Sequence, residues 1–129
     1  MERILVVYDD PRSEQIVHRI LEPAGYDVIT VPFSPIAMGV FHKTKPGLVV
    51  LDIGQRGKLG QDLCRRLSVS GVPLLVVSAV GDVADVVLML ALGADDYITK
   101  PFSPRELLAR VQVAVNRSEK PWPEGAVFK

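Results

Sequence analysis

The sequence predicts an α/β fold, in which a parallel sheet of five strands is covered by helices on both faces. Three observations lead to this prediction. The chain has 129 residues, which is the size of one domain. Short β-like runs, several of them continuous and apolar as in strands buried on both faces, alternate five times with segments of helical spacing. Strands that alternate with helices in this way pair in parallel through right-handed crossovers.

The first two strand–helix units are marked by clear start and stop signals. Residues 4–7 (ILVV) form the first apolar run, and Asp10 before Pro11 is typical of a helix start. Gly25 is expected to end that helix. The second strand is expected at residues 27–31, and the helix after it begins near Ser34.

The remaining three units follow the same pattern, with strands expected at residues 48–51, 74–77 and 96–99. A loop rich in glycine separates the first of these strands from the third helix. The fourth helix is expected at residues 82–92, and Ser103 is expected to cap the fifth.

Composition limits the classes of function. We expect one domain at residues 1–117 and a linker or tail at 118–129, where prolines and a glycine interrupt any periodicity. Fifteen basic and fifteen acidic residues cancel, which argues against a domain that binds nucleic acid by itself. The single cysteine excludes an internal disulfide, and no apolar run is long enough for a membrane span. We therefore expect a cytoplasmic location and no membrane partner.

Chemically useful side chains follow four of the expected strands, at Asp9, Asp52, Ser78 and Lys100. Alone, each has a simpler explanation, because aspartates are common in turns and lysines on surfaces. Ligands of open parallel sheets bind at the carboxyl ends of the strands, however, and all four residues occupy such ends. We expect them to gather around the carboxylate of Asp52 in one water-accessible hollow.

Over residues 3–117 the chain resembles the receiver domain of bacterial two-component response regulators. The segments ILVV, VVLD and VVSA occur in the order and spacing of that family. The segment GADDYITKPFSPRELLARV is specific to the subfamily with winged-helix DNA-binding effectors. The resemblance implies a doubly wound, flavodoxin-like fold with strand order 2-1-3-4-5 and five helices.

The resemblance also implies a phosphorylation site. Asp52 resembles the phosphoacceptor, which takes a phosphoryl group from a histidine kinase. Asp9, Asp52 and the backbone carbonyl of Gly54 resemble the ligands of Mg²⁺ or Mn²⁺. A hard divalent cation suits this set, because two carboxylates about 4 Å apart repel each other by a few kcal/mol at an effective dielectric near 20.

Three further residues resemble the parts that respond to phosphorylation. Ser78 and Lys100 resemble the residues that contact the phosphoryl group, and Tyr97 resembles an aromatic switch that turns inward. The implied output is dimerisation and control of an effector that regulates transcription. DNA would be contacted only through a further effector domain. Apart from its own phosphorylation and dephosphorylation, we expect no enzymatic activity.

Two departures from the family pattern affect the site. Tyr8 stands at the first of the two usual acidic positions, and Asp10 falls where a helix cap is expected. The pocket therefore has one carboxylate fewer, so we expect weaker metal binding and slower phosphorylation. Arg56 replaces a common proline, and we expect a solvated side chain on a more mobile loop.

The fourth helix is apolar nearly all round, whereas its outer face is usually charged in the family. Family dimers pair through the fourth helix, last strand and fifth helix by ion pairs. Asp96 and Arg110 match one such pair, while Val86 and Ala91 replace charged partners and leave Glu106 without its expected mate. We expect a symmetric homodimer through Val86, Leu90, Asp96 and Arg110. The alternative is a helix buried more deeply than usual.

Three other functions compete with this interpretation. A pseudo-receiver would bind partners without phosphorylation, and Tyr8 favours it. A flavodoxin-like cofactor binder would need a hydroxyl-rich phosphate cradle, where this chain has Asp9 and Asp10. A phosphohydrolase would need a second acid two residues after its nucleophile, where this chain has Gly54.

Overall fold

The computed structural model describes residues 2–117 of the chain. Five strands run through the sequence: β1 (Arg3–Tyr8), β2 (Asp27–Pro32), β3 (Leu48–Gly54), β4 (Leu74–Ser78) and β5 (Asp96–Thr99). They alternate with five helices: α1 (Pro11–Leu21), α2 (Ala37–Thr44), α3 (Lys58–Ser68), α4 (Val83–Ala91) and α5 (Pro104–Arg117). A short 3₁₀ helix, η1 (Glu22–Ala24), follows α1. The predicted tail at 118–129 lies outside the described residues.

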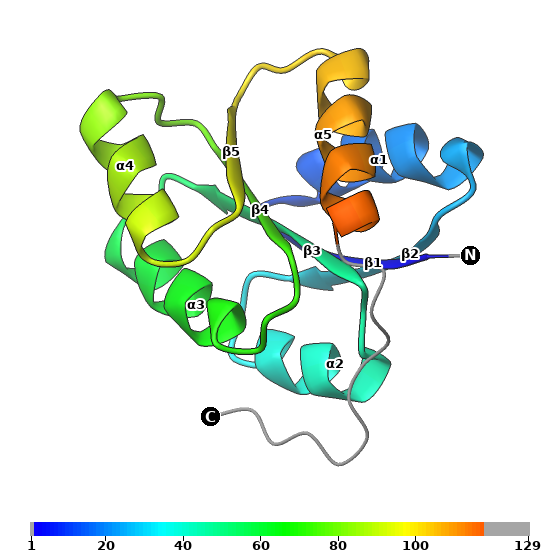
Figure 1. The fold of residues 1–129 in the computed structure, drawn as a ribbon, viewed down its shortest axis with the longest axis horizontal. Coiled ribbons are helices and arrows are strands. Elements are labelled where there is room, and N and C mark those ends of the chain that lie inside the picture. Colours follow the sequence, from blue (N-terminus) through cyan, green and yellow to red (C-terminus); the bar gives the residue numbers. More distant parts are fainter. Residues whose placement is uncertain (1, 118–129) are drawn as a thin grey trace.

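The strands form one parallel sheet in the order β2-β1-β3-β4-β5, which confirms the predicted topology. The order reverses between β1 and β3, because the chain moves to one edge with β2 and then returns to build the other edge. Figure 1 shows the resulting layers, with α1 and α5 on one face and α2, α3 and α4 on the other. The reversal brings the carboxyl ends of β1 and β3 side by side, where ligands of such sheets bind.

Two apolar cores lie on opposite faces of the sheet, since successive strand residues point to opposite sides. Ile4 and Val6 of β1 belong to the core under α1 and α5, together with Leu107 of α5. Leu5 and Val7 belong to the core under α2, α3 and α4, with Phe41. This burial on both faces explains why the strands are continuous apolar runs rather than alternating ones.

The predicted starts of α1 and α5 are confirmed, whereas the predicted end of α1 is wrong. The Asp10 carboxylate accepts a hydrogen bond from the Ser13 backbone N–H (2.8 Å) and caps α1. Ser103 Oγ accepts one from the Glu106 N–H (3.0 Å) at the start of α5. Gly25 ends η1 rather than α1, with a left-handed φ of 98° that favours glycine. None of the helices within residues 2–117 is long and apolar enough to cross a bilayer.

Two other predicted boundaries are wrong. The second helix begins at Ala37 instead of near Ser34, and β3 continues through Asp52 to Gly54 instead of ending before Asp52. Because β3 lies between β1 and β4, its polar end is still paired on one side, with a register shift between Asp52 and Gly54. Asp52 is therefore held by sheet backbone and is not part of a flexible loop.

Candidate phosphorylation site

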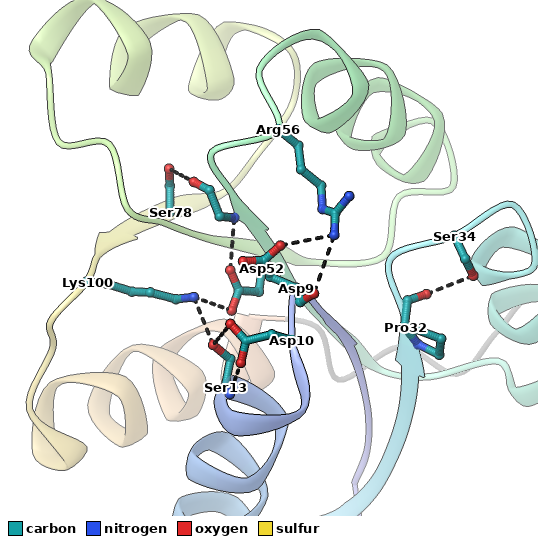
Figure 2. Close-up of polar contacts among 10 residues, drawn as sticks. Asp9, Asp10, Ser13, Pro32, Ser34, Asp52, Arg56, Ser78 and Lys100 are labelled. Carbon is teal, nitrogen blue, oxygen red and sulfur yellow. Dashed lines mark hydrogen bonds and ion pairs between the residues drawn. The ribbon is translucent and has the colours of Figure 1, made fainter.

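Asp52 lies at the centre of the rim formed by the carboxyl ends of β1, β3, β4 and β5. The Nζ atom of Lys100, which follows β5, lies 2.7 Å from Oδ2 of Asp52. The Gly54 N–H donates to Oδ1 of the same carboxylate at 3.0 Å. Lys100 Nζ also donates to Ser13 Oγ on α1 at 3.0 Å. Figure 2 shows the Lys100 ammonium between Asp52 and Ser13, with an interaction to each.

Asp52 is far less accessible than the sequence led us to expect. Only 1% of the residue is exposed, so the expectation of a water-accessible carboxylate is wrong for this conformation. Burial raises the pKa of Asp52 above its ordinary value, although the Lys100 ammonium and the Gly54 N–H lower it in part. Asp52 nevertheless borders a cavity of about 410 Å³, lined also by Ile16, Lys100 and Phe102.

Ser78 lies beside the site without contacting Asp52. Its hydroxyl donates to the Gly54 carbonyl at 3.1 Å and accepts from the Val80 N–H at 3.0 Å. The Gly54 carbonyl also accepts from the Ala79 N–H at 3.1 Å, so both of its lone pairs are used. The hydroxyl must therefore rotate before it can meet a phosphoryl group, and that rotation would free a lone pair of Gly54.

Tyr97 on β5 is turned inward, with 9% of the residue exposed. Its hydroxyl donates a short hydrogen bond to the carbonyl of Val80. Val80 thus links Ser78, through its N–H, to Tyr97, through its carbonyl. The inward orientation predicted for the switch residue is present while Ser78 still faces Gly54.

Asp9 pairs with Arg56, contrary to the expectation of a solvated arginine. A terminal guanidinium nitrogen of Arg56 lies 3.0 Å from Asp9 Oδ1, and it also donates to the Asp9 carbonyl at 3.4 Å. The guanidinium stacks on the ring of Phe33, with 4.5 Å between the guanidinium carbon and the ring centroid. Figure 2 shows Arg56 reaching down to Asp9 from the loop after β3.

The carboxylate of Asp9 lies directly against the backbone of Gly54. A Cβ atom at Gly54 would come within 2.3 Å of an Asp9 carboxylate oxygen, and the Gly54 φ is +53°. Only glycine meets both conditions without strain. The glycine therefore lets Asp9 approach the end of β3, where its charge also contributes to raising the pKa of Asp52.

The oxygen atoms at this rim suit a hard divalent cation, because Asp9 and Asp52 bring two carboxylates together. Oδ2 of Asp52 is paired with the Lys100 ammonium in this conformation. Within residues 2–117 no group of three or more acidic, histidine or cysteine side chains could hold a metal. Tyr8 supplies no carboxylate, and that of Asp10 caps α1. The residues that could hold the ion are thus Asp9 and Asp52, with Gly54 as a backbone ligand once Ser78 releases it.

The residues predicted for a dimer face divide into two groups. Arg110 binds both carboxylate oxygens of Asp96 within the chain, at 2.7 and 3.0 Å, and also approaches Glu106 at 3.5 Å. Glu106 therefore has a partner within the chain, and the loss of its partner across a dimer stays a prediction. Val86 is half-buried against the core, whereas Leu90 is 42% exposed.

Leu88 of α4 is 39% exposed. The other exposed large apolar residues of this helix form one helical stripe, which consists of Val83 (74% exposed), Val87 (58%) and Leu90 (42%). Their spacing of four and three residues places them on one side of the helix. Only Met89 of α4 is buried, so the alternative of a deeply buried helix is wrong.

The contacts of two residues at the site were not predicted from the sequence. Ser13 holds the Lys100 ammonium, and Arg56 neutralises Asp9. Ser13 had one available signal, because it stands three residues after the capping Asp10 and so faces the same rim. No signal in the sequence indicated the contact between Arg56 and Asp9, except that Arg56 replaces a common proline. The two residues are 47 positions apart, so their pairing depends on the folded loop.

Comparison with known proteins agrees with this geometry. The model of the response regulator receiver domain family matches residues 4–112, which is most of the chain. The fold and the polar groups at the strand ends define a doubly wound α/β domain with an acidic site, and the family match specifies which domain it is. This chain belongs to the response regulator receiver domain family of two-component signal transduction.

The curated relatives include transcriptional regulators. The DNA-binding response regulator MtrA of Mycolicibacterium smegmatis is 42% identical over 119 residues, covering 92% of this chain and 52% of MtrA. The regulator ycf27 of Galdieria sulphuraria is 40% identical over 120 residues, covering 92% of this chain and 47% of that protein. The chain therefore spans about half the length of these relatives.

Solved structures show the same fold. The BeF₃-activated N-terminal receiver domain of Klebsiella pneumoniae RstA is 34% identical, with a TM-score of 0.78, over 88% of this chain and 97% of that one. A response regulator from Thermotoga maritima is 28% identical, with a TM-score of 0.82, over 90% of this chain and 98% of that one. The receiver fold is thus shared over nearly the whole described region.

Proposed function

We propose that this chain accepts a phosphoryl group on Asp52 from a histidine kinase and thereby controls dimerisation and a transcriptional effector. The observation that carries the proposal is the 2.7 Å contact between Lys100 Nζ and Asp52 Oδ2 at the meeting point of β1 and β3. A buried carboxylate beside an ammonium supplies both a nucleophile and a charge that can stabilise the transferred group.

The proposed reaction is a phosphoryl transfer between two side chains. A carboxylate oxygen of Asp52 attacks phosphorus, the P–N bond to the kinase histidine breaks, and its electron pair returns to the imidazole. Lys100 follows the negative charge from the free carboxylate to an oxygen of the phosphoryl group. A divalent ion held by Asp9 and Asp52 would neutralise further phosphoryl charge. The product is an acyl phosphate, which hydrolyses readily and so suits a transient signal.

The response begins at Ser78 and Val80. The phosphoryl group offers Ser78 a new hydrogen-bond acceptor, which draws the hydroxyl away from Gly54. Because the Val80 N–H donates to the same hydroxyl, the Val80 peptide moves with it. Tyr97 is bonded to the Val80 carbonyl, so the shift is transmitted to β5 and the neighbouring face.

That face is the proposed dimer interface, formed by α4, β5 and α5. The stripe Val83–Val87–Leu90 offers apolar area, and the Asp96–Arg110 pair offers charges that a second copy could share. The relatives MtrA and ycf27 are transcriptional regulators of about twice this length, which supports a DNA-binding effector acting with the receiver. The proposal includes a cytoplasmic location, which the single free, buried Cys64 suits.

Beyond self-phosphorylation and dephosphorylation, we assign the chain no enzymatic activity. The pseudo-receiver alternative gains no support from the comparisons, because the matched proteins are response regulators.

Incubation with acetyl phosphate and Mg²⁺, followed by intact-mass measurement, tests the proposal. We expect the mass of one phosphoryl group on the wild-type chain and none on the Asp52→Asn variant. A folded wild-type chain that gains no phosphoryl group would contradict it.

A further inference from the structure

The pairing of Arg56 with Asp9 places a permanent positive charge on one of the two carboxylates proposed to hold the metal. The distance between the guanidinium nitrogen and Asp9 Oδ1 is 3.0 Å, and the Arg56 side chain is about one-third exposed, at 32%. Arginine stays charged at every pH at which the protein folds. A divalent cation that binds Asp9 must therefore displace the guanidinium or tolerate it as a neighbour.

The charges at the rim favour Arg56 over a divalent cation in the competition for Asp9. Asp9 and Asp52 face Arg56 and Lys100, so the two carboxylates closest to the proposed ion are already matched by two cations. Tyr8 removes the acid that usually adds a further negative charge, and the Asp10 carboxylate is engaged in capping α1. The attraction of the rim for a divalent cation is thus reduced in two independent ways.

The Arg56 guanidinium has a favourable contact with an aromatic ring, but its Nε–H has no hydrogen-bond partner among the described residues. Phe33 stacks against it at 4.5 Å, which gives Arg56 a second anchor outside the rim. Its Nε–H is buried without a hydrogen-bond partner among the described residues, which is an unfavourable arrangement. An arginine bound in this way can leave Asp9, because its departure lets the Nε–H reach water.

We infer that Arg56 is an intramolecular competitor of the divalent cation, so that metal binding and the Arg56–Asp9 pair exclude each other. The inference rests on the proposed metal site at Asp9 and Asp52. Its consequence is a receiver whose metal affinity is set by its own loop. Metal binding releases Arg56 from Asp9 and alters the stacking on Phe33 before any phosphoryl group arrives.

The test measures Mn²⁺ affinity by electron paramagnetic resonance, which requires no phosphorylation. We expect Arg56→Gln to bind Mn²⁺ about threefold to fivefold more tightly than the wild type, as for the loss of one partly exposed ion pair. Arg66→Gln removes an equal charge from the exposed surface of α3 and should leave the affinity within about twofold, since a distant surface charge is screened. Phe33→Leu keeps the ion pair but removes the stacking, and should raise the affinity to a smaller extent.

A second measurement follows Arg56 itself. The Arg56 Nε–H gives a nitrogen–proton NMR signal, which is identified by its absence in Arg56→Gln. We expect this signal to shift during a Mg²⁺ titration with the midpoint of metal binding. Equal Mn²⁺ affinities for wild type and Arg56→Gln, with a stationary Nε–H signal, would overturn the inference while leaving the metal site intact. Absence of metal binding in all variants would overturn the metal site and the inference together.

Discussion

The ammonium of Lys100 lies 2.7 Å from Oδ2 of Asp52, a carboxylate with almost no exposure to solvent. The raised pKa of Asp52 shows that burial disfavours its charged form more than Lys100 favours it. A folded-state pKa above the unfolded value means that the folded protein holds the proton more tightly. The contribution of Asp52 to stability is therefore greatest at low pH, where the carboxyl group is protonated, and is lost as the pH rises through the raised pKa.

Two substitutions at this pair should change stability in opposite directions. We expect Asp52→Asn to increase the free energy of unfolding at neutral pH, because it removes a buried charge. Lys100→Met should decrease it by about 2–4 kcal/mol, because it leaves the carboxylate buried without a counter-charge. Urea denaturation in a chelator measures both, with Lys43→Met on α2 as the exposed control. A Lys100→Met variant as stable as the wild type would contradict this account of the pair.

Tyr8 offers a direct test of the missing acid. We expect Tyr8→Asp to raise Mg²⁺ affinity by about tenfold, since it adds a carboxylate beside Asp9, and to accelerate phosphorylation by acetyl phosphate. Tyr8→Asn removes the same ring without adding charge and should resemble the wild type. Calorimetric titration with Mg²⁺ decides between them, and equal affinities for Tyr8→Asp and wild type would refute the prediction.

His18 should make stability depend on pH near neutrality. One ring nitrogen of His18 contacts the carboxylate of Glu22, and the other contacts that of Glu14 at 3.3 Å. Both carboxylates raise the pKa of His18, and Glu22 has the larger effect. The stabilisation is fully present below the unfolded pKa of about 6.5 and is lost as the pH rises through the folded value.

Between about pH 6 and about pH 8 we expect the free energy of unfolding to fall by a few tenths of a kcal/mol more in the wild type than in His18→Gln. The difference is small because the histidine is partly exposed. Thermal or urea unfolding at both pH values measures this. Glu22→Gln should reduce the difference. The same pH dependence in wild type and His18→Gln would show that the contacts contribute nothing.

Much of the fold could be predicted from sequence because its signals are local. Four apolar residues in a row identify a strand covered on both faces, and Asp10 before Pro11 identifies a helix start without any distant information. The site was predicted as far as strand ends determine it, at Asp52 and Lys100. The pairing of Arg56 with Asp9 could not be predicted, because it depends on the path of a loop and on the ring of Phe33. The burial of Asp52 likewise depends on how Lys100 lies across it.

The apolar stripe of α4 predicts how the dimer should respond to substitution and salt. With beryllofluoride as the phosphoryl analogue, we expect sedimentation to show a dimer whose association changes little with salt concentration. Val87→Glu should weaken it at least about tenfold by placing a charge in an apolar interface. Val69→Glu, at an exposed valine after α3, should have no effect. A wild-type chain that stays monomeric at high concentration would contradict the interface.

The most direct test of the central claim is chemical trapping of the phosphoryl group. Hydroxylamine converts an acyl phosphate to a stable hydroxamate, which peptide mass spectrometry can locate after treatment with acetyl phosphate and Mg²⁺. We predict a hydroxamate on Asp52 alone, absent without the phosphodonor and absent in Asp52→Asn. A hydroxamate on Asp9 or Asp10, or none on a folded wild-type chain, would contradict the assignment of Asp52 as the phosphoacceptor.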